Sequence, residues 1–276
     1  MNKKLKKKRQ PQGFSLVELM IAMTIGLLLS LGTATLYFSS KRSSVAQSQY
    51  AVIEDNGRLA LEVLTRIIEH TGYVASNGSP LAGSDRFITS AVTAANCGGQ
   101  NNVLAPSLFA TTKNNIAGDS IGIVYLGDDN LNRDCGGAQL PPACRVGGVG
   151  TIEASKIYNY FSVGVNAEGV PVLQCAGSRS VNRIEIAEGI ENLQVLYGID
   201  KDNDNQVDQY VNADQVSAWN RIISVQVAIL VRSLREVKSN KESKSYTLLD
   251  NSPITKNDKY QRAIFSTIVR LRNVQL

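Results

Sequence analysis

The feature that most constrains how this chain can fold is an apolar run of 25 residues near its N-terminus. The run extends from Phe14 to Phe38 and contains one charged residue, Glu18. An α-helix rises about 1.5 Å per residue, so the run corresponds to about 37 Å of helix, enough to cross a hydrocarbon core of about 30 Å. Six basic residues precede it: Lys3, Lys4, Lys6, Lys7, Lys8 and Arg9. Because basic flanks stay in the cytoplasm, the sequence predicts one membrane-spanning helix with the rest of the chain exported.

The same basic tail explains the formal net charge of +5. Residues 14–276 hold 23 basic and 24 acidic side chains, so the positive balance does not indicate a nucleic-acid partner. Residues 119–214 carry 6 basic and 14 acidic side chains, whereas residues 215–276 carry 11 basic and 4 acidic. We interpret these opposed segments as attracting each other within one fold. The alternative is a basic docking surface for DNA or for an acidic partner.

Glu18 needs an explanation, because a charged group at mid-membrane costs about 2.5–3.5 kcal/mol. One alternative is a plain anchor with an interfacial glutamate, and another is a secretory signal cut within Leu31-Gly32-Thr33-Ala34. The stretch Gly13-Phe14-Ser15-Leu16-Val17-Glu18-Leu19-Met20-Ile21-Ala22 instead resembles the type IV prepilin motif. The resemblance implies that a prepilin peptidase cuts after Gly13 and methylates the new N-terminus at Phe14. Cleavage there keeps the apolar helix in the mature protein.

The resemblance also gives Glu18 a role. In type IV pilins the glutamate at the fifth mature position neutralises the N-terminal amine of a neighbouring subunit in the filament core. Carried over to this chain, Glu18 and the amine of Phe14 form the assembly charge pair. Two charges that are each costly in lipid then offset one another, which favours assembly.

Beyond Phe38 the pattern predicts that the helix continues to about residue 70. Apolar residues recur at spacings of three, four and seven, as in an amphipathic helix: Val45, Val52, Ile53, Leu59, Ala60, Val63, Leu64, Ile67 and Ile68. Gly72 provides a stop signal. His70, the single histidine, has no nucleophile motif or metal-ligand partner in the sequence, and we interpret it as structural or surface-exposed.

The remainder, residues 71–276, reads as a β-rich head domain with long loops. Six segments have strand-like composition: Ser120–Leu126, Ile157–Val165, Arg183–Ile186, Asn192–Tyr197, Ile222–Val231 and Ala263–Leu271. In the fifth of these, Ile and Val alternate with other residues, which predicts a sheet with one well-buried face. Together with the prepilin resemblance, these patterns imply a leader (1–13), a long helix (14–70, with 14–38 transmembrane) and a head (71–276). The expected fold class is α+β and type IV pilin-like, with a mainly antiparallel head.

Four cysteines, Cys97, Cys135, Cys144 and Cys175, all lie in the exported part. An even number in an oxidising compartment predicts two disulfides, with three possible connectivities. The short loop between Cys135 and Cys144 favours pairing these two, which leaves Cys97 with Cys175. A zinc site is the alternative, but the spacing fits no compact zinc knuckle.

A second resemblance covers the C-terminal half. The stretch Ile190-Glu191-Asn192-Leu193-Gln194-Val195-Leu196-Tyr197-Gly198-Ile199-Asp200 and the closing Phe265-Ser266-Thr267-Ile268-Val269-Arg270-Leu271-Arg272-Asn273 resemble the PilW family of type IV minor pilins. The helix exit from Arg66 to Tyr73 also fits this family. Residues 75–180 match no shared pattern.

The best candidate for a chemical site is an acidic loop within that match. Carboxylates at alternate positions are typical of loops that bind Ca²⁺: Asp200, Asp202, Asp204 and Asp208. Gln206 would add its main-chain carbonyl. Asn205 replaces the usual glycine at the turn, and Val211 replaces the bidentate glutamate of an EF-hand. The sequence predicts a Ca²⁺ site, with a solvated acidic turn as the alternative.

A weaker version of the pattern comprises Asp128, Asn130, Asn132 and Asp134, where turn formation explains the residues equally well.

Taken together, the resemblances imply a minor pilin, and no catalysis. Such a protein would sit in the inner membrane with its head in the periplasm, would help to initiate pilus assembly and would end near the pilus tip at the cell surface. The implied partners are the prepilin peptidase, other minor pilins, the major pilin and a large tip adhesin. Alternatives are a minor pseudopilin of a type II secretion system and a DNA-binding or adhesive tip protein.

Overall fold

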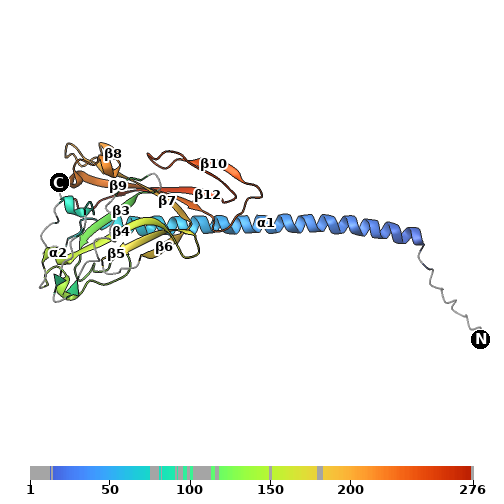
Figure 1. Cartoon of the computed structure of the whole chain (residues 1–276), viewed down its shortest axis with the longest axis horizontal. Coiled ribbons are helices and arrows are strands. Elements are labelled where there is room, and N and C mark those ends of the chain that lie inside the picture. The colour runs from blue at the N-terminus through green and yellow to red at the C-terminus, as the bar shows by residue number, and fades with distance from the viewer. Residues whose placement is uncertain are drawn as a thin grey trace, which may run out of the picture. The chain divides into compact units, whose positions relative to one another are not determined.

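The computed structural model describes residues 13, 15–74, 81, 83–90, 92, 96–97, 100–101, 113–115, 118–148, 151–178 and 183–274 (Figure 1). The chain divides into two compact units, residues 1–47 and residues 48–276. The first helix, α1 (Leu16–Glu69), contributes its N-terminal part to the first unit and its C-terminal part to the second. Antiparallel sheets follow the helix, which confirms the predicted fold class.

Helix α1 is continuous over 54 residues and ends one residue before the predicted boundary. The stop depends on Gly72, whose φ of +71° is readily adopted only by residues without a Cβ atom. The Gly72 amide donates to the carbonyl of Val124 at 2.9 Å, so the end of the helix is attached directly to a strand.

Two four-stranded antiparallel sheets form the head. The first is a meander in which each strand pairs with the next along the chain: β3 (Ser120–Leu126), β4 (Lys156–Val165), β5 (Pro171–Gly177) and β6 (Ile184–Glu188). The second has the order β12-β9-β7-β8: β12 (Arg262–Arg270), β9 (Ile222–Arg232), β7 (Ile190–Ile199) and β8 (Gln209–Val211).

Smaller elements complete the described part of the head. Two hairpins are β1 (Asn96–Cys97) with β2 (Gln100–Asn101), and β10 (Glu242–Tyr246) with β11 (Ile254–Asp258). The short helical segments are α2 (Ile152–Ser155) and four 3₁₀ turns: Gly83–Arg86, Pro142–Cys144, Ala213–Gln215 and Trp219–Arg221.

All six predicted strands exist, but one expectation about them is wrong. Strand β9 was expected to bury one face, and both faces are buried. Ile223, Val225, Val227, Ile229 and Val231 are 0–3% exposed, and on the opposite face Ala228 and Leu230 are also covered. The reason is the β10–β11 hairpin, whose Tyr246 packs on that second face together with Leu248.

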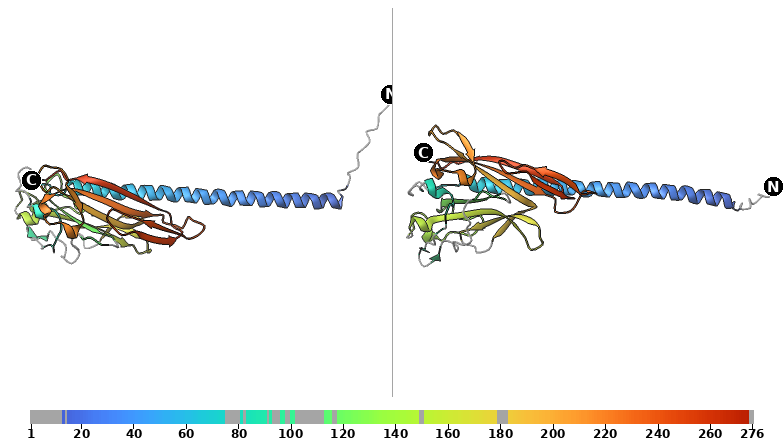
Figure 2. Two further views of the ribbon diagram at one scale, coloured as in Figure 1. Left: turned by 90° about the horizontal axis from the view of Figure 1, so that it is seen from above. Right: turned by 45° about the horizontal axis from the view of Figure 1, so that its top comes forward.

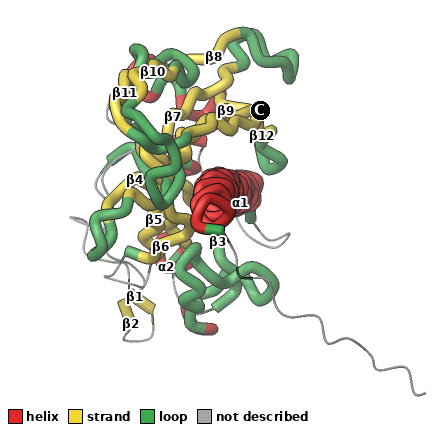
Figure 3. Tube along the Cα trace, turned by 90° about the vertical axis from the view of Figure 1, so that its right-hand side faces the viewer, coloured by secondary structure: helices red, strands yellow, loops and turns green. Residues whose placement is uncertain are grey.

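The core is organised around one face of α1. Within residues 48–276 the buried helix positions are spaced by three, four and seven: Ile53, Gly57, Ala60, Leu64 and Ile68. They share one apolar cluster with residues of both sheets, and Figures 2 and 3 show strands of both sheets beside this part of the helix. The predicted stripe was too wide, because Val45 and Leu59 are more than 40% exposed.

A buried carboxylate connects the two sheets. Asp119, directly before β3, donates its amide to the carbonyl of Leu193 on β7 at 2.6 Å. Its carboxylate accepts from the amides of Asn115 at 2.5 Å and Val195 at 2.9 Å. Burial raises the pKa of Asp119 to about 6, although the two backbone donors oppose that shift.

We predict that Gly57→Ala destabilises the head. Alanine normally stabilises a helix by about 1 kcal/mol relative to glycine. Here a Cβ atom would lie 2.6–2.9 Å from the ring of Phe265 on β12, so we expect a net loss of about 1–3 kcal/mol. Thermal unfolding of the full chain in detergent, followed by circular dichroism, measures the change.

Arg58→Ala is the matched control, because the Arg58 side chain is 79% exposed and the change should stay within about 0.5 kcal/mol. Gly57→Ala combined with Phe265→Leu should cost less than the sum of the two single changes. A Gly57→Ala protein more stable than the parent would contradict the contact.

Candidate functional site

The N-terminal part of α1 has the properties of a membrane segment. An 18-residue window within the helix has a mean hydropathy of 2.0, and none of it is buried by the rest of the chain that the structure describes. The large apolar side chains between Leu16 and Phe38 are each more than half exposed. Such a surface needs lipid or neighbouring helices to cover it, so the helix fits anchoring in the inner membrane.

Glu18 caps the start of this helix, a contact that the sequence analysis did not anticipate. The Ser15 amide donates to the Glu18 carboxylate at 3.2 Å, and the Val17 amide lies 3.4 Å from the Ser15 hydroxyl. This is a capping box, in which serine and glutamate three residues apart satisfy free amides of the first turn. The pattern Ser15-Leu16-Val17-Glu18 was the available signal. Gly13 precedes the helix, and Phe14 lies outside the described residues.

The capping box gives Glu18 a local partner. A carboxylate at a helix N-terminus is stabilised by the free amides and by the helix dipole. Glu18 is therefore bonded within the first turn of its own helix.

The acidic loop connects β7 to β8 and wraps around Asp200. The Asp200 carboxylate is fully buried and accepts the amides of Asn203 at 2.7 Å and Asn205 at 2.9 Å. Both asparagines have φ of 65°, the left-handed conformation that Asn tolerates better than most residues. The expectation that Asn205 replaces the turn glycine is therefore confirmed in its backbone conformation.

Three of the four predicted carboxylates converge. Oxygens of Asp200, Asp202 and Asp208 all lie within 4.8 Å of one another, so this cluster could hold a metal ion. Partial desolvation and the nearby carboxylates, Asp204 first among them, raise the pKa of Asp202. A cation bound between these groups would relieve that repulsion.

Asp204 does not join the cluster. Its two carboxylate oxygens accept from the backbone amide and the side-chain amide of Gln206, at 2.7 and 2.8 Å. The alternate spacing therefore does not identify a ligand at position 204, because the turn at Asn203 and Asn205 directs the Asp204 carboxylate away from the other three. Two arginines that the sequence analysis missed hold the loop from outside: Arg221 donates to the carbonyl of Lys201, and Arg270 to that of Asn205.

The weaker acidic pattern, from Asp128 to Asp134, stabilises turns of the backbone. The Asp128 carboxylate accepts from the amides of Asn130 and Leu131 and from the Tyr73 hydroxyl. Burial opposes ionisation of Asp128, but these donors outweigh it and lower its pKa. Asp134 likewise accepts the amides of Gly136 and Ala138.

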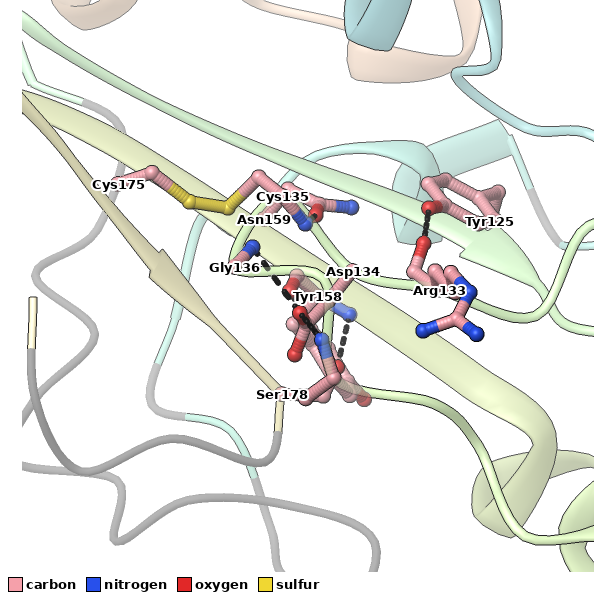
Figure 4. The surroundings of a disulfide bond; sticks show 10 residues. Tyr125, Arg133, Asp134, Cys135, Gly136, Tyr158, Asn159, Cys175 and Ser178 are labelled. Atoms are coloured by element: carbon pink, nitrogen blue, oxygen red, sulfur yellow. Dashed lines mark hydrogen bonds between the residues drawn. A yellow bond between two sulfur atoms is a disulfide. The ribbon is translucent and has the colours of Figure 1, made fainter. Parts of the chain in front are cut away.

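The predicted disulfide pairing is wrong. Cys135 is bonded to Cys175, with a Cα–Cα distance of 6.3 Å (Figure 4). The reason is that the Cys135 amide donates to the side chain of Asn159 on β4, next to the strand that carries Cys175. Cys144 packs in a different apolar cluster with Tyr125 and is also disulfide-bonded. The side chain of Cys97 lies outside the described residues.

His70 fits the predicted structural use. Its ring meets Tyr125 edge-on, with centroids 5.8 Å apart. Burial, followed by the charge of Arg66, lowers the pKa of His70, so the ring is neutral at pH 7. Its Nδ1 atom is buried and has no hydrogen-bond partner among the described residues.

Comparison with known proteins finds two family models in this chain. Residues 8–34 match the prokaryotic N-terminal methylation motif, and residues 160–273 match type IV pilus-assembly protein W, PilW. A type IV-like pilin from Thermus thermophilus is similar in structure, with 15% sequence identity and a TM-score of 0.42. The similarity covers 80% of this chain and 97% of that one. No curated protein matches the chain.

The long N-terminal helix, the antiparallel head and the methylation motif are those of a type IV pilin-like protein, and the motif implies processing by a prepilin peptidase. Its head carries a PilW region that extends from β4 through β12, and the motif implies that it assembles with other pilins.

We predict that peptide mapping without reduction recovers a Cys135–Cys175 cross-linked peptide. Replacing both residues by alanine should destabilise the head by about 4 kcal/mol, because the bond closes a loop between positions 40 residues apart. Denaturant unfolding of the full chain measures the loss. A Cys135–Cys144 peptide from the untreated protein would contradict the pairing.

Proposed function

We propose that this protein is a minor pilin that helps to initiate type IV pilus assembly and is located near the pilus tip. The observation that carries the proposal is the order of parts along the chain. An exposed apolar helix begins directly after a prepilin cleavage motif and continues into a head with a PilW region. The proposed partners are other minor pilins, the major pilin and a tip adhesin, and no catalysis is assigned.

Assembly proceeds by exchange of the partners of Glu18. In the membrane-inserted precursor, the Ser15 amide donates to the Glu18 carboxylate. After cleavage, the methylated amine of Phe14 in one subunit and Glu18 in the next form an ion pair among the bundled helices. Isolated charges are expensive in lipid, so pairing favours the filament over the separate subunits. The head stays in the periplasm until the subunit enters the pilus.

We predict that the mature chain begins at methylated Phe14, as read by intact mass and N-terminal sequencing of protein from membranes. A deletion strain should lose most surface pili and regain them with the parent gene. Glu18→Gln should be cleaved normally but fail to restore pili, because the neutral amide cannot pair with the amine. Electron microscopy and shear preparations of pili provide the readout.

Glu54→Gln is the matched control, since Glu54 is a glutamate of the same helix whose contact is an exposed ion pair with Arg58. It should restore pili fully. Normal piliation in the Glu18→Gln strain would refute the charge-pair mechanism. A deletion strain that keeps its pili but loses protein secretion would instead assign the protein to a type II secretion system as a pseudopilin.

We further propose that the acidic loop binds Ca²⁺ through Asp200, Asp202 and Asp208. Carboxylate oxygens are the ligands that Ca²⁺ prefers, and backbone carbonyls such as that of Gln206 complete such sites. The loop lacks the bidentate glutamate of an EF-hand at Val211, so the expected affinity is in the range of about 10⁻⁴–10⁻³ M. Bound Ca²⁺ would fix the β7–β8 connection of the head.

Millimolar Ca²⁺ should then stabilise the full chain by about 1–2 kcal/mol in thermal unfolding, and EDTA should reverse the effect. Asp202→Asn should abolish the shift, because it removes one of three converging carboxylates. Asp204→Asn is the matched control and should retain the shift, because Asp204 is bonded to Gln206 instead. Equal responses of the two variants would refute the assignment.

A further inference from the structure

A basic surface lies beside Gln49 and Tyr50, near the first residues of the head unit. It is formed by residues 233–246 and 254–261, which include β10 and β11 and are named here the basic hairpin. These stretches contain six basic and three acidic residues. The basic ones are Arg235, Lys238, Lys241, Lys244, Lys256 and Lys259.

The position of the basic hairpin follows from its contacts with the helix. The amides of Leu234 and Arg235 donate to the side chain of Gln49, at 3.0 and 3.1 Å, and the Gln261 side chain donates to the Tyr50 hydroxyl. The eleven residues from Phe38 to Gln49 are helical and rise by about 16 Å. Both ends of the hairpin are therefore attached to helix residues that follow the end of the apolar run by only eleven and twelve positions along the chain.

The hairpin is held rigidly against the second sheet. Arg262 at the start of β12 makes paired hydrogen bonds to two carboxylates, Glu191 on β7 and Asp258 on β11, at 2.6–3.0 Å. The Arg262 side chain is 3% exposed. Its hydrogen bonds to Asp258 outweigh the opposing effect of burial and lower the pKa of Asp258 to about 2. Tyr246 anchors the other strand in a small apolar cluster.

Several positive charges of the hairpin are left without an acidic partner. Lys238 pairs with Glu242, and Lys259 lies 3.9 Å from Glu236. Arg235, Lys241 and Lys256 make no ion pair with any residue in the described ranges.

The pairing of β10 with β11 places two lysines opposite each other. Lys244 and Lys256 are direct cross-strand partners, and like charges in that arrangement are destabilising. An external anion would remove this repulsion.

We infer that the basic hairpin docks on the anionic phospholipid headgroups of the membrane in which the helix is anchored. The inference rests on the proposed insertion of residues 14–38. Lipid phosphates are the anions that a surface tethered so close to the bilayer meets at the highest local concentration. Each Lys or Arg close to an anionic surface raises the binding constant about fivefold. The effect falls off within a Debye length, about 8 Å at physiological salt. The contact holds the head against the membrane until the subunit is extracted into a filament.

Lysine footprinting of the full processed chain in lipid nanodiscs tests this docking. A neutral acetylating reagent is applied in phosphatidylcholine discs and in discs containing phosphatidylglycerol, and peptides are quantified by mass spectrometry. We expect acetylation of Lys241, Lys244 and Lys256 to slow severalfold in the anionic discs and to recover in high salt. Lys113, on the other sheet, should react equally in both. Equal rates at the three hairpin lysines would overturn the inference.

A charge-matched pair of variants adds a second readout. Lys241→Gln/Lys244→Gln/Lys256→Gln should remove the lipid-dependent protection that remains at Lys238 and Lys259. Lys113→Gln/Arg133→Gln/Arg183→Gln removes the same charge elsewhere and should preserve it. Protection that requires a second pilin subunit, or that is as strong in neutral discs, would overturn lipid docking. The fraction of the chain recovered with the discs is measured separately. A chain that fails to enter the discs would refute the membrane anchoring itself.

Discussion

The structure of the head depends on the burial of one narrow stripe of α1 between two sheets. Ile53, Leu64 and Ile68 are fully buried there, and burying each such side chain contributes about 1.5–3 kcal/mol. The small residues Gly57 and Ala60 lie on the same stripe and let β12 approach, with the Phe265 ring directly over Gly57. Neither sheet alone could cover this face, since the same cluster includes inward residues of both.

That arrangement divides one continuous helix into two chemically different halves. From Ser48 onward the helix finds its apolar partners inside its own chain, whereas between Leu16 and Phe38 its large apolar side chains remain exposed. The exposed half must therefore obtain its partners from lipid or from other helices, which is the requirement for a protein that moves from a membrane into a filament. Glu18 is consistent with this division, because its contact with the Ser15 amide lies within its own helix, and the proposed assembly mechanism exchanges that contact for an ion pair with another subunit.

Sequence patterns predicted the elements that have strong periodicity and missed those that depend on packing. The long strands β7, β9 and β12 are rich in β-branched residues and were predicted, whereas β10 and β11 consist of polar sequences, Glu242–Tyr246 and Ile254–Asp258, and were not. The disulfide could not be derived from spacing, because the approach of Cys135 to Cys175 depends on tertiary contacts such as that of the Cys135 amide with Asn159 on the neighbouring strand. At the acidic loop, alternate spacing identified Asp200, Asp202 and Asp208, but the left-handed turn that directs Asp204 to Gln206 became visible only with the backbone.

The opposed charges of the two C-terminal segments attract each other at Glu191, which pairs with Arg262 at 2.6 Å and lies 3.8 Å from Arg232. The acidic loop and the basic hairpin do not take part in this contact. Arg270 contacts the acidic loop through the carbonyl of Asn205, and among the described residues the loop's carboxylates make no ion pair. The basic hairpin is attached at Gln49, whereas Arg272 next to the acidic loop pairs with Glu69, twenty residues or about 30 Å further along the helix. At that separation, several Debye lengths, exposed charges are screened from one another. The acidic loop and the basic hairpin are therefore electrostatically independent of each other, and each is available to a different external partner.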